Sequence, residues 1–167
     1  MTDIKARNEQ HLAPLHPTLV AMVRRLLADC ETVGCPTMVA QGHRSAVTQQ
    51  ALWMQGRYYP LDVVNQARSK ALLAPITAVE NKRIVTKSKP GYSFHEYDLA
   101  VDLAYAVGDL YKELDHPLTW SQIGALGEAH GLTWGGRFHE PDRPHFQWSG
   151  GLALSQLRAG QRPPVVA

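Results

Sequence analysis

Residues 93–102 read SFHEYDLAVD and combine a predicted strand with two candidate metal ligands. From Leu99 onward large and small side chains alternate, which is typical of a β-strand with one apolar face and one small-residue face. Asp102 lies on the small-residue face, and His95 belongs to the loop that leads into the strand. A loop histidine folded over a strand carboxylate would form half of a metal site.

The other half is expected far along the chain. The tripeptide WGG at 134–136 predicts the end of a strand followed by a glycine turn. The segment DRPHFQW at 142–148 predicts another strand, in which His145 and Gln147 share one face. The proline before His145 favours an extended residue in front of it, so Asp142 is expected just before the strand.

These two segments supply three ligand types that zinc binds in catalytic sites, namely His95, Asp102 and His145. Three protein ligands leave the fourth position for water, as a catalytic zinc site requires. Asp142 would then be a spare carboxylate able to take the proton of that water. An acid on an interior strand is costly unless it is paired or metal-bound, which favours the ligand role of Asp102.

The pattern S-x-H-x-x-x-x-A-x-D, followed downstream by W-G-G and D-x-P-H-F, resembles the zinc peptidases of the D-alanyl-D-alanine carboxypeptidase superfamily. Within it, the chain is most similar to the L-alanyl-D-glutamate peptidases that phages use as endolysins. Two upstream motifs, QGHRS at 41–45 and LWMQGR at 52–57, support the resemblance, which runs from about Leu15 to Trp148. Asp98 stands where the family usually has glycine; Asp tolerates left-handed backbone, so the turn is expected to survive.

The resemblance implies a role for each site residue. It makes His95, Asp102 and His145 the zinc ligands and Asp142 the general base. Arg44 follows a predicted strand and is expected to hold a substrate carboxylate or a developing oxyanion, the alternative being a surface ion pair. Candidate substrate-binding residues are also His43, which replaces a usual tyrosine and could equally be structural, and Ser93, which is expected to support its loop. Glu96 could be a second acid, although an exposed loop carboxylate is favoured.

The predicted function is a zinc-dependent peptidase that cleaves peptidoglycan stem peptides at the L-alanyl-D-glutamate bond, as a phage or prophage endolysin in host cell lysis. One alternative is a D-alanyl-D-alanine carboxypeptidase or dipeptidase that acts on a free C-terminus. Another is a zinc-stabilised binding module that has lost catalysis, against which the retained Asp142 argues. The resemblance also implies that release depends on a partner that permeabilises the inner membrane, such as a holin.

Composition limits the other possibilities. The 167 residues predict one domain, 1–167, with a core over about 15–150 and a flexible tail over about 160–167. A formal charge of +2 gives no argument for nucleic acid, and no apolar run approaches the ~20 residues of a membrane span. The N-terminus lacks the apolar core of a signal peptide. We therefore expect a monomer that stays in the cytoplasm of the producing cell and acts on the wall after release.

Local signals predict an α+β fold: a small antiparallel sheet with helices packed on one face and a zinc cleft on the other. The expected helices begin at Pro17, run from Ser45 to Gly56 and from 62 to 73, and follow the capping box of Thr119 and Gln122; the further strands are 37–41, 132–134 and 145–148. Residues 1–15 are expected to be loosely held. The segment 76–89 has no clear element, is basic, and is expected to border the cleft. Cys30 and Cys35 predict two reduced thiols rather than a disulfide.

Overall fold

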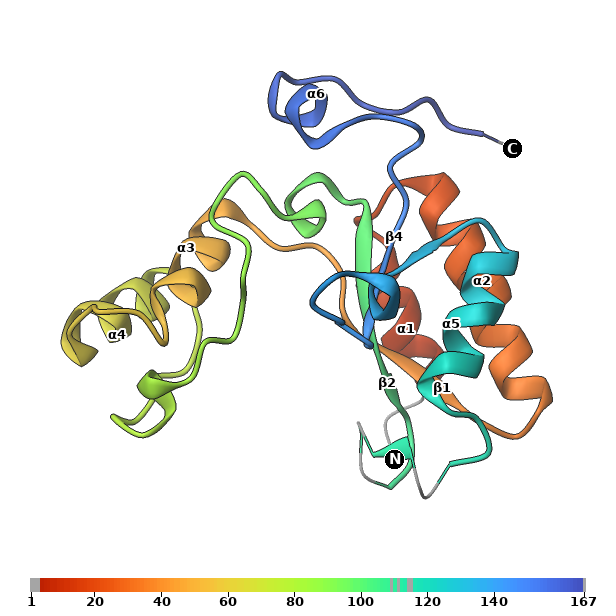
Figure 1. Ribbon diagram of the computed structural model, residues 1–167, viewed down its shortest axis with the longest axis horizontal. Helices are drawn as coiled ribbons and strands as arrows, with labels where there is room; N and C mark the ends of the chain where they lie inside the picture. Colours follow the sequence, from red (N-terminus) through yellow and green to blue (C-terminus); the bar gives the residue numbers. More distant parts are fainter. Residues whose placement is uncertain (1–3, 109, 111, 114–115, 167) are drawn as a thin grey trace.

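The computed structural model describes residues 4–108, 110, 112–113 and 116–166. In these residues four strands form one antiparallel sheet in the order β1-β2-β4-β3 (Figure 1). The strands are β1 (Thr37–Gln41), β2 (Ala100–Tyr105), β3 (Thr133–Trp134) and β4 (His145–Gln147). All four lie where the sequence patterns placed them, and the α+β prediction is confirmed.

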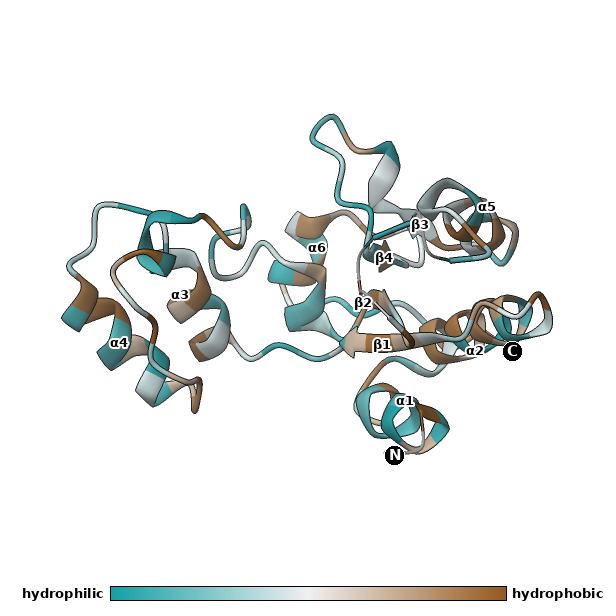
Figure 2. Ribbon diagram, turned by 90° about the horizontal axis from the view of Figure 1, so that it is seen from below, coloured by the Kyte–Doolittle hydropathy of each residue, from teal (hydrophilic) through white to brown (hydrophobic). Residues whose placement is uncertain are grey.

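The helices are α1 (Ile4–Leu12), α2 (Pro17–Thr32), α3 (Ala46–Met54), α4 (Leu61–Lys70), α5 (Trp120–Ala129) and α6 (Leu154–Arg158). Short 3₁₀ helices lie at Glu80–Lys82 (η1), Phe94–Tyr97 (η2) and Gly135–Arg137 (η4). In two perpendicular views, α2 and α5 lie on one side of the sheet and the α3–α4 pair on the other (Figures 1 and 2). Among the described helices, none is both long and apolar enough to cross a membrane.

The alternation along β2 decides which face of the sheet meets the core. Val101 and Leu103 are fully buried and pack with side chains of α1, α2 and α5. Val101 is opposite Phe146 of β4, which is also fully buried in that core. The next register position pairs Asp102 with His145. Because side chains of a strand alternate between faces, this pair points away from the core.

Local capping signals explain where several helices begin. The Ser45 side chain accepts a hydrogen bond from the Thr48 amide at 3.1 Å and starts α3. Thr119 and Gln122 form the predicted capping box of α5. The ends are less accurate: α3 stops at Met54 rather than Gly56, and α4 covers 61–70 rather than 62–73.

The α3–α4 lobe, residues 46–89, is set apart from the sheet (Figure 1). Its return segment passes so close to Gly56 that a Cβ there would lie 2.3 Å from the Ile84 amide nitrogen. Gly56 also has a φ of +79°, a conformation that favours glycine. The Gln49 side chain donates to Thr86 Oγ1 at 3.2 Å and to the Ser88 carbonyl at 2.5 Å. The basic segment that the sequence left unassigned is therefore fixed against α3.

The described residues near both chain ends, 4–15 and 160–166, make contacts that the sequence did not suggest. Residues 1–15 were expected to be loose, but α1 packs on β1 and places Leu12, which is fully buried, in the core. The tail was expected to be flexible, but Thr18 Oγ1 donates to the Val166 carbonyl at 3.2 Å and accepts from its amide at 2.8 Å. The expectation for 4–15 was wrong because the partners of α1 are distant in sequence, whereas flexibility of the tail stays a prediction; residues 1–3 and 167 lie outside the described residues.

Both cysteines are free thiols, as predicted, and the structure shows that both are also buried. Burial raises the pKa of the Cys30 thiol to about 11, so this thiol stays protonated at neutral pH.

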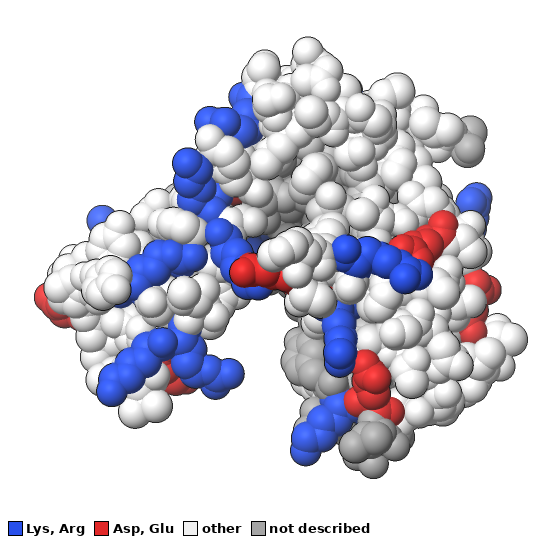
Figure 3. All heavy atoms as spheres, viewed as in Figure 1, with Lys and Arg blue, Asp and Glu red and all other residues white. Residues whose placement is uncertain are grey.

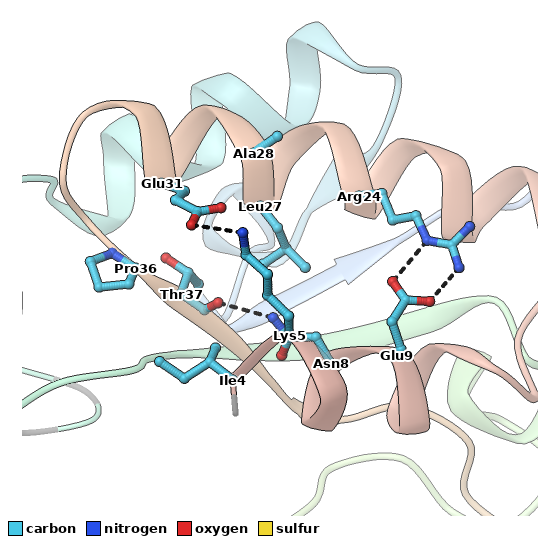
Figure 4. Close-up of a pocket in the computed structure, with 10 residues that line it drawn as sticks. All are labelled: Ile4, Lys5, Asn8, Glu9, Arg24, Leu27, Ala28, Glu31, Pro36 and Thr37. Carbon is cyan, nitrogen blue, oxygen red and sulfur yellow. Dashed lines mark hydrogen bonds and ion pairs between the residues drawn. The ribbon is translucent and has the colours of Figure 1, made fainter. Parts of the chain in front are cut away.

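Asn8 attaches α1 to the sheet, as Figure 4 shows beside a cavity of about 550 Å³ between α1 and α2. Its side chain donates to the Thr37 carbonyl at 3.3 Å and accepts from the Val39 amide at 2.8 Å. Strand β1 is at the edge of the sheet, so Asn8 takes the place of a neighbouring strand for these two groups. Ion pairs Arg24–Glu9 and Lys5–Glu31 join the two helices around the cavity.

Replacing Asn8 tests this attachment. Asn8→Ala leaves two buried backbone groups of β1 without partners and should lower the free energy of unfolding by about 1–3 kcal/mol. Gln10→Ala, on the exposed side of the same helix, is the matched control and should change it by less than about 0.5 kcal/mol. Urea unfolding measures both. Equal effects in the two variants would contradict the role given to Asn8.

Candidate metal centre

The structure brings together the three side chains that the sequence proposed as ligands. Nitrogen and oxygen atoms of His95, Asp102 and His145 all lie within 4.8 Å of one another. Asp102 Oδ1 is 3.3 Å from His95 Nε2 and 3.1 Å from His145 Nδ1. The β2–β4 register places two of these residues opposite each other, and η2 adds the third. Their assignment as zinc ligands stays a prediction, which this geometry supports.

In His95 and His145, one ring nitrogen forms a hydrogen bond outside the cluster, and the other ring nitrogen therefore faces Asp102. His95 Nδ1 lies 2.7 Å from the Gly42 carbonyl, and His145 Nε2 lies 3.0 Å from Gln147 Oε1. A nitrogen beside a carbonyl oxygen acts as the donor, which leaves Nε2 of His95 and Nδ1 of His145 with free lone pairs. Such outer partners fix the tautomer and the ring orientation of metal-binding histidines.

This donor set fits zinc. Two imidazole nitrogens and one carboxylate oxygen face one another, and lone pairs brought this close repel unless a cation or a proton lies between them. Neutral imidazole and carboxylate are ordinary zinc ligands, and three of them form a catalytic rather than a structural set. His95, Asp102 and His145 are therefore the residues that would hold the ion.

The loop that presents His95 is held by its own polar groups. The Glu96 carboxylate accepts from the Gly91 amide at 2.9 Å and from the Ser93 amide at 3.3 Å. Asp98 adopts the left-handed conformation, with φ of +61°, which confirms that the turn survives without glycine. Glu96 is thus a partly buried residue that stabilises this loop, rather than the exposed carboxylate that was favoured, and Ser93 completes its capping box.

Electrostatics in the cluster follows from burial and from its hydrogen bonds. Burial raises the pKa of Asp102, but hydrogen bonds from His145 and His95 outweigh this effect and hold that pKa well below its usual range. For His145 burial lowers the pKa, yet the hydrogen bond with Asp102 more than compensates, so its pKa is raised. A proton on an inward nitrogen donates to Asp102, and a metal ion must displace that proton.

Asp142 lies beside the cluster in the turn before β4. Its amide donates to the Gly135 carbonyl at 2.9 Å, and its carbonyl accepts from the His145 amide at 3.2 Å. The residue retains solvent contact and lines the same cavity as the three candidate ligands. Partial desolvation by the cavity walls, followed by the negative charge of Asp102, raises its pKa. A more basic carboxylate is a better proton acceptor at neutral pH. The general-base role stays a prediction.

Arg44 is not the exposed ion pair considered as its alternative, because only 8% of the residue is exposed. It donates to Gln49 Oε1 at 2.9 Å and to Gln41 Oε1 at 2.5 Å, and its Nη2 lies 3.6 Å from Asp102 Oδ2. Its Nε is buried without a hydrogen-bond partner. Arg44 therefore lies next to Asp102 and is held by two glutamine side chains.

His43 lies in a different environment from Arg44. Its Nδ1 is 2.6 Å from Asp98 Oδ1, so the ring is attached to the loop that presents His95. This contact agrees with the structural alternative, while substrate binding by His43 stays a prediction.

A cavity of about 950 Å³ lies over the cluster, between the sheet and the α3–α4 lobe. The lobe contributes Arg57 and residues 84–88, which confirms the expectation that the basic segment borders the cleft. The opposite wall includes Phe138, Glu140, Pro141 and Asp142. Sequence reasoning missed Lys87, Glu140 and Gln147 as residues of the site, although the basic character of 76–89 was a signal for the first.

Removing any ligand tests the metal assignment. His95→Ala, Asp102→Ala and His145→Ala should each reduce bound zinc from about one equivalent per chain and abolish activity together with it. His139→Ala, an exposed histidine of the neighbouring turn, is the control and should retain zinc. Full zinc occupancy in all three ligand variants, measured by elemental analysis, would refute the assignment.

Proton competition gives an independent test. The raised pKa of His145 means that acid protonates it at a higher pH than an ordinary imidazole at ~6.5. Zinc binding should therefore be complete above that pKa and should weaken as the pH falls through it. Competition with a fluorescent chelator between about pH 5 and pH 8 measures this. Excess zinc should partly restore activity in acid, and an acid limb insensitive to zinc would belong to another group.

Comparisons with known proteins agree with this site. Residues 86–148, which contain all three candidate ligands and Asp142, match the family model described as D-alanyl-D-alanine carboxypeptidase. The chain is 24% identical over 142 residues to the peptidoglycan L-alanyl-D-glutamate endopeptidase CwlK of Bacillus subtilis (strain 168), covering 80% of this chain and 72% of that protein.

Solved structures share the fold. The L-Ala D-Glu endopeptidase ChiX of Serratia marcescens superposes with a TM-score of 0.53 at 23% identity, covering 92% of this chain and 91% of that one. The vancomycin resistance D,D-pentapeptidase VanY, solved in complex with Zn(II), gives a TM-score of 0.51 at 17% identity, covering 87% and 78%. The segment around His95, Asp102 and His145 is thus similar to the D-alanyl-D-alanine carboxypeptidase family, and the chain shares the fold of these solved peptidases.

Proposed function

We propose that this protein is a zinc-dependent peptidoglycan peptidase that hydrolyses the L-alanyl-D-glutamate bond of the stem peptide. The observation that carries the proposal is the His95, Asp102 and His145 cluster with Asp142 beside it in one solvent-accessible cavity. The choice of bond is supported by CwlK and ChiX, whose names state this specificity.

The chain's own residues can perform the steps of such a hydrolysis. Zinc, when bound, would polarise the scissile carbonyl and lower the pKa of a water toward ~7. Asp142 would accept the proton from the attacking water and transfer it to the leaving amine. Arg44 lines the cavity and would stabilise negative charge through its guanidinium, whose Nη2 lies 3.6 Å from Asp102 Oδ2. Gly42 and Gln147 would keep both imidazoles oriented.

The nearest alternative is a D-alanyl-D-alanine carboxypeptidase, which the description of the matching family model and the VanY neighbour favour. Digestion of purified cell wall, followed by mass spectrometry of the new termini, separates the two functions. New D-glutamate amines support the endopeptidase, and released D-alanine supports the carboxypeptidase. Wall binding without any new termini would instead indicate a binding module.

The biological setting is also part of the proposal. The resemblance of the motifs to phage endolysins supports synthesis in the cytoplasm of the producing cell and action on the wall after release by a holin. Expression with and without a co-expressed holin tests this: turbidity should fall only when both are present. Lysis by the protein alone would contradict dependence on a holin.

Asp142→Asn separates proton transfer from metal binding. Asparagine has nearly the same shape but cannot accept a proton from water, so the variant should fold and keep its zinc. Its turnover should fall by about 10²–10⁴, the usual contribution of a general base. Elemental analysis and kinetics on muropeptides check the two parts separately. Loss of zinc would make Asp142 a ligand, and unchanged turnover would place the base elsewhere.

A further inference from the structure

An ion pair joins the two walls of the catalytic cavity. Lys87 Nζ of the α3–α4 lobe lies 2.5 Å from Glu140 Oε2, which belongs to the segment between η4 and β4. Both residues line the cavity that contains Asp102, Asp142 and His145. Their side chains are 67% and 63% exposed, so the pair lies in solvent at the mouth of the cavity rather than in its floor.

Lys87 differs from the other two cations that line this cavity. Arg44 is buried and bonded to Gln41 and Gln49. Arg57 stacks on the Trp53 ring and donates to the Trp53 and Thr86 carbonyls. Both guanidiniums are thus held by groups of the fold. The Lys87 ammonium instead pairs with the exposed carboxylate of Glu140, so a ligand carboxylate can replace this partner.

The energetics favour such an exchange. An exposed lysine–carboxylate pair typically contributes little to stability, because solvent screens it and both side chains lose rotamer freedom. Replacing Glu140 by another carboxylate therefore costs the fold little. The lobe is also basic: residues 57–89 contain seven Lys and Arg against two Asp and Glu, and most of the charged side chains on its visible face are basic (Figure 3). An anionic ligand is attracted to this side of the cavity.

The proposed substrate carries a suitable group. A glutamate residue has two carboxyl groups, and only one is needed to continue the peptide. The other remains a free carboxylate on the residue that supplies the leaving amine, next to the scissile bond. Lys87 lines the same cavity as Asp142, from the opposite wall, and its ammonium is the complementary partner for this group.

We infer that Lys87 determines specificity by binding the free carboxylate of the D-glutamate residue. In the free protein Glu140 forms an ion pair with Lys87, and the substrate carboxylate displaces Glu140 from this pair. This inference rests on the proposed function. Glu140 is then an internal competitor, which makes the cavity selective for a ligand carboxylate able to displace it.

Two peptides that differ in one group test the inference. One contains L-alanyl-D-glutamate with the free carboxylate, and the other carries a neutral amide in its place. Zinc-loaded wild-type protein should show a kcat/KM about tenfold higher for the acid, as a hydrogen bond between charged groups implies. Lys87→Gln should remove this preference through a higher KM for the acid, with the amide unaffected.

Variants of the partner and of a neighbouring lysine complete the design. Glu140→Gln should lower the KM for the acid severalfold, and this gain should vanish in the Lys87→Gln background, since a coupled pair is not additive. Lys82→Gln removes an exposed lobe charge outside the cavity and should leave the preference intact. An equal loss on both peptides in Lys87→Gln, or no preference in the wild type, would overturn the inference.

Binding measurements distinguish failure of this inference from failure of the proposed function. Calorimetry with the two D-glutamyl product peptides, acid and amide, needs no turnover. If neither peptide is hydrolysed but acid-selective binding depends on Lys87, the recognition stands and the assigned bond is wrong. If the acid peptide is hydrolysed without any dependence on residue 87, the function stands and the inference is overturned.

Discussion

The structure depends on a carboxylate placed between two imidazoles. Asp102 is a charged residue on a central strand, and burying such a charge is costly unless it is compensated. His95 and His145 provide that compensation at 3.3 and 3.1 Å, and Arg44 approaches the second oxygen from behind. The same arrangement places lone pairs where a zinc ion would be held, so the group that requires compensation also creates the metal site.

The register between β2 and β4 decides which side chains face the core and which face the cavity. Val101 faces Phe146 in the core, and Asp102 faces His145 at the cavity one position further on. A slip of one residue would bring the carboxylate into the core and the apolar side chains to the cavity. The core that α1, α2 and α5 form on one face therefore fixes the ligand geometry on the other.

The α3–α4 lobe lines one side of the cavity over the His95, Asp102 and His145 cluster, but its residues do not belong to the main hydrophobic core. Gln49 and Arg57 hold the Thr86–Ser88 segment by hydrogen bonds, and Gly56 lets it pass closely over α3. This segment brings Lys87 to the cavity mouth. Asp102 and His145 thus belong to the sheet, whereas Lys87 belongs to the lobe, so the proposed ligands and the proposed recognition group lie on different parts of the fold.

The sequence by itself determined the elements and residues whose signals are local. Alternation identified β2, the caps at Ser45 and Thr119 located α3 and α5, and two motifs identified His95, Asp102, His145 and Asp142 as a group. Only the tertiary structure decided which nitrogen of each histidine faces inward, how Arg44 is bonded, and that Lys87 meets Glu140. It also decided that Asn8 joins α1 to β1 and that Thr18 is hydrogen-bonded to Val166. The physical reason is range: periodicity and capping act within one or two turns, whereas these contacts join residues far apart in sequence, which only the folded sheet brings together.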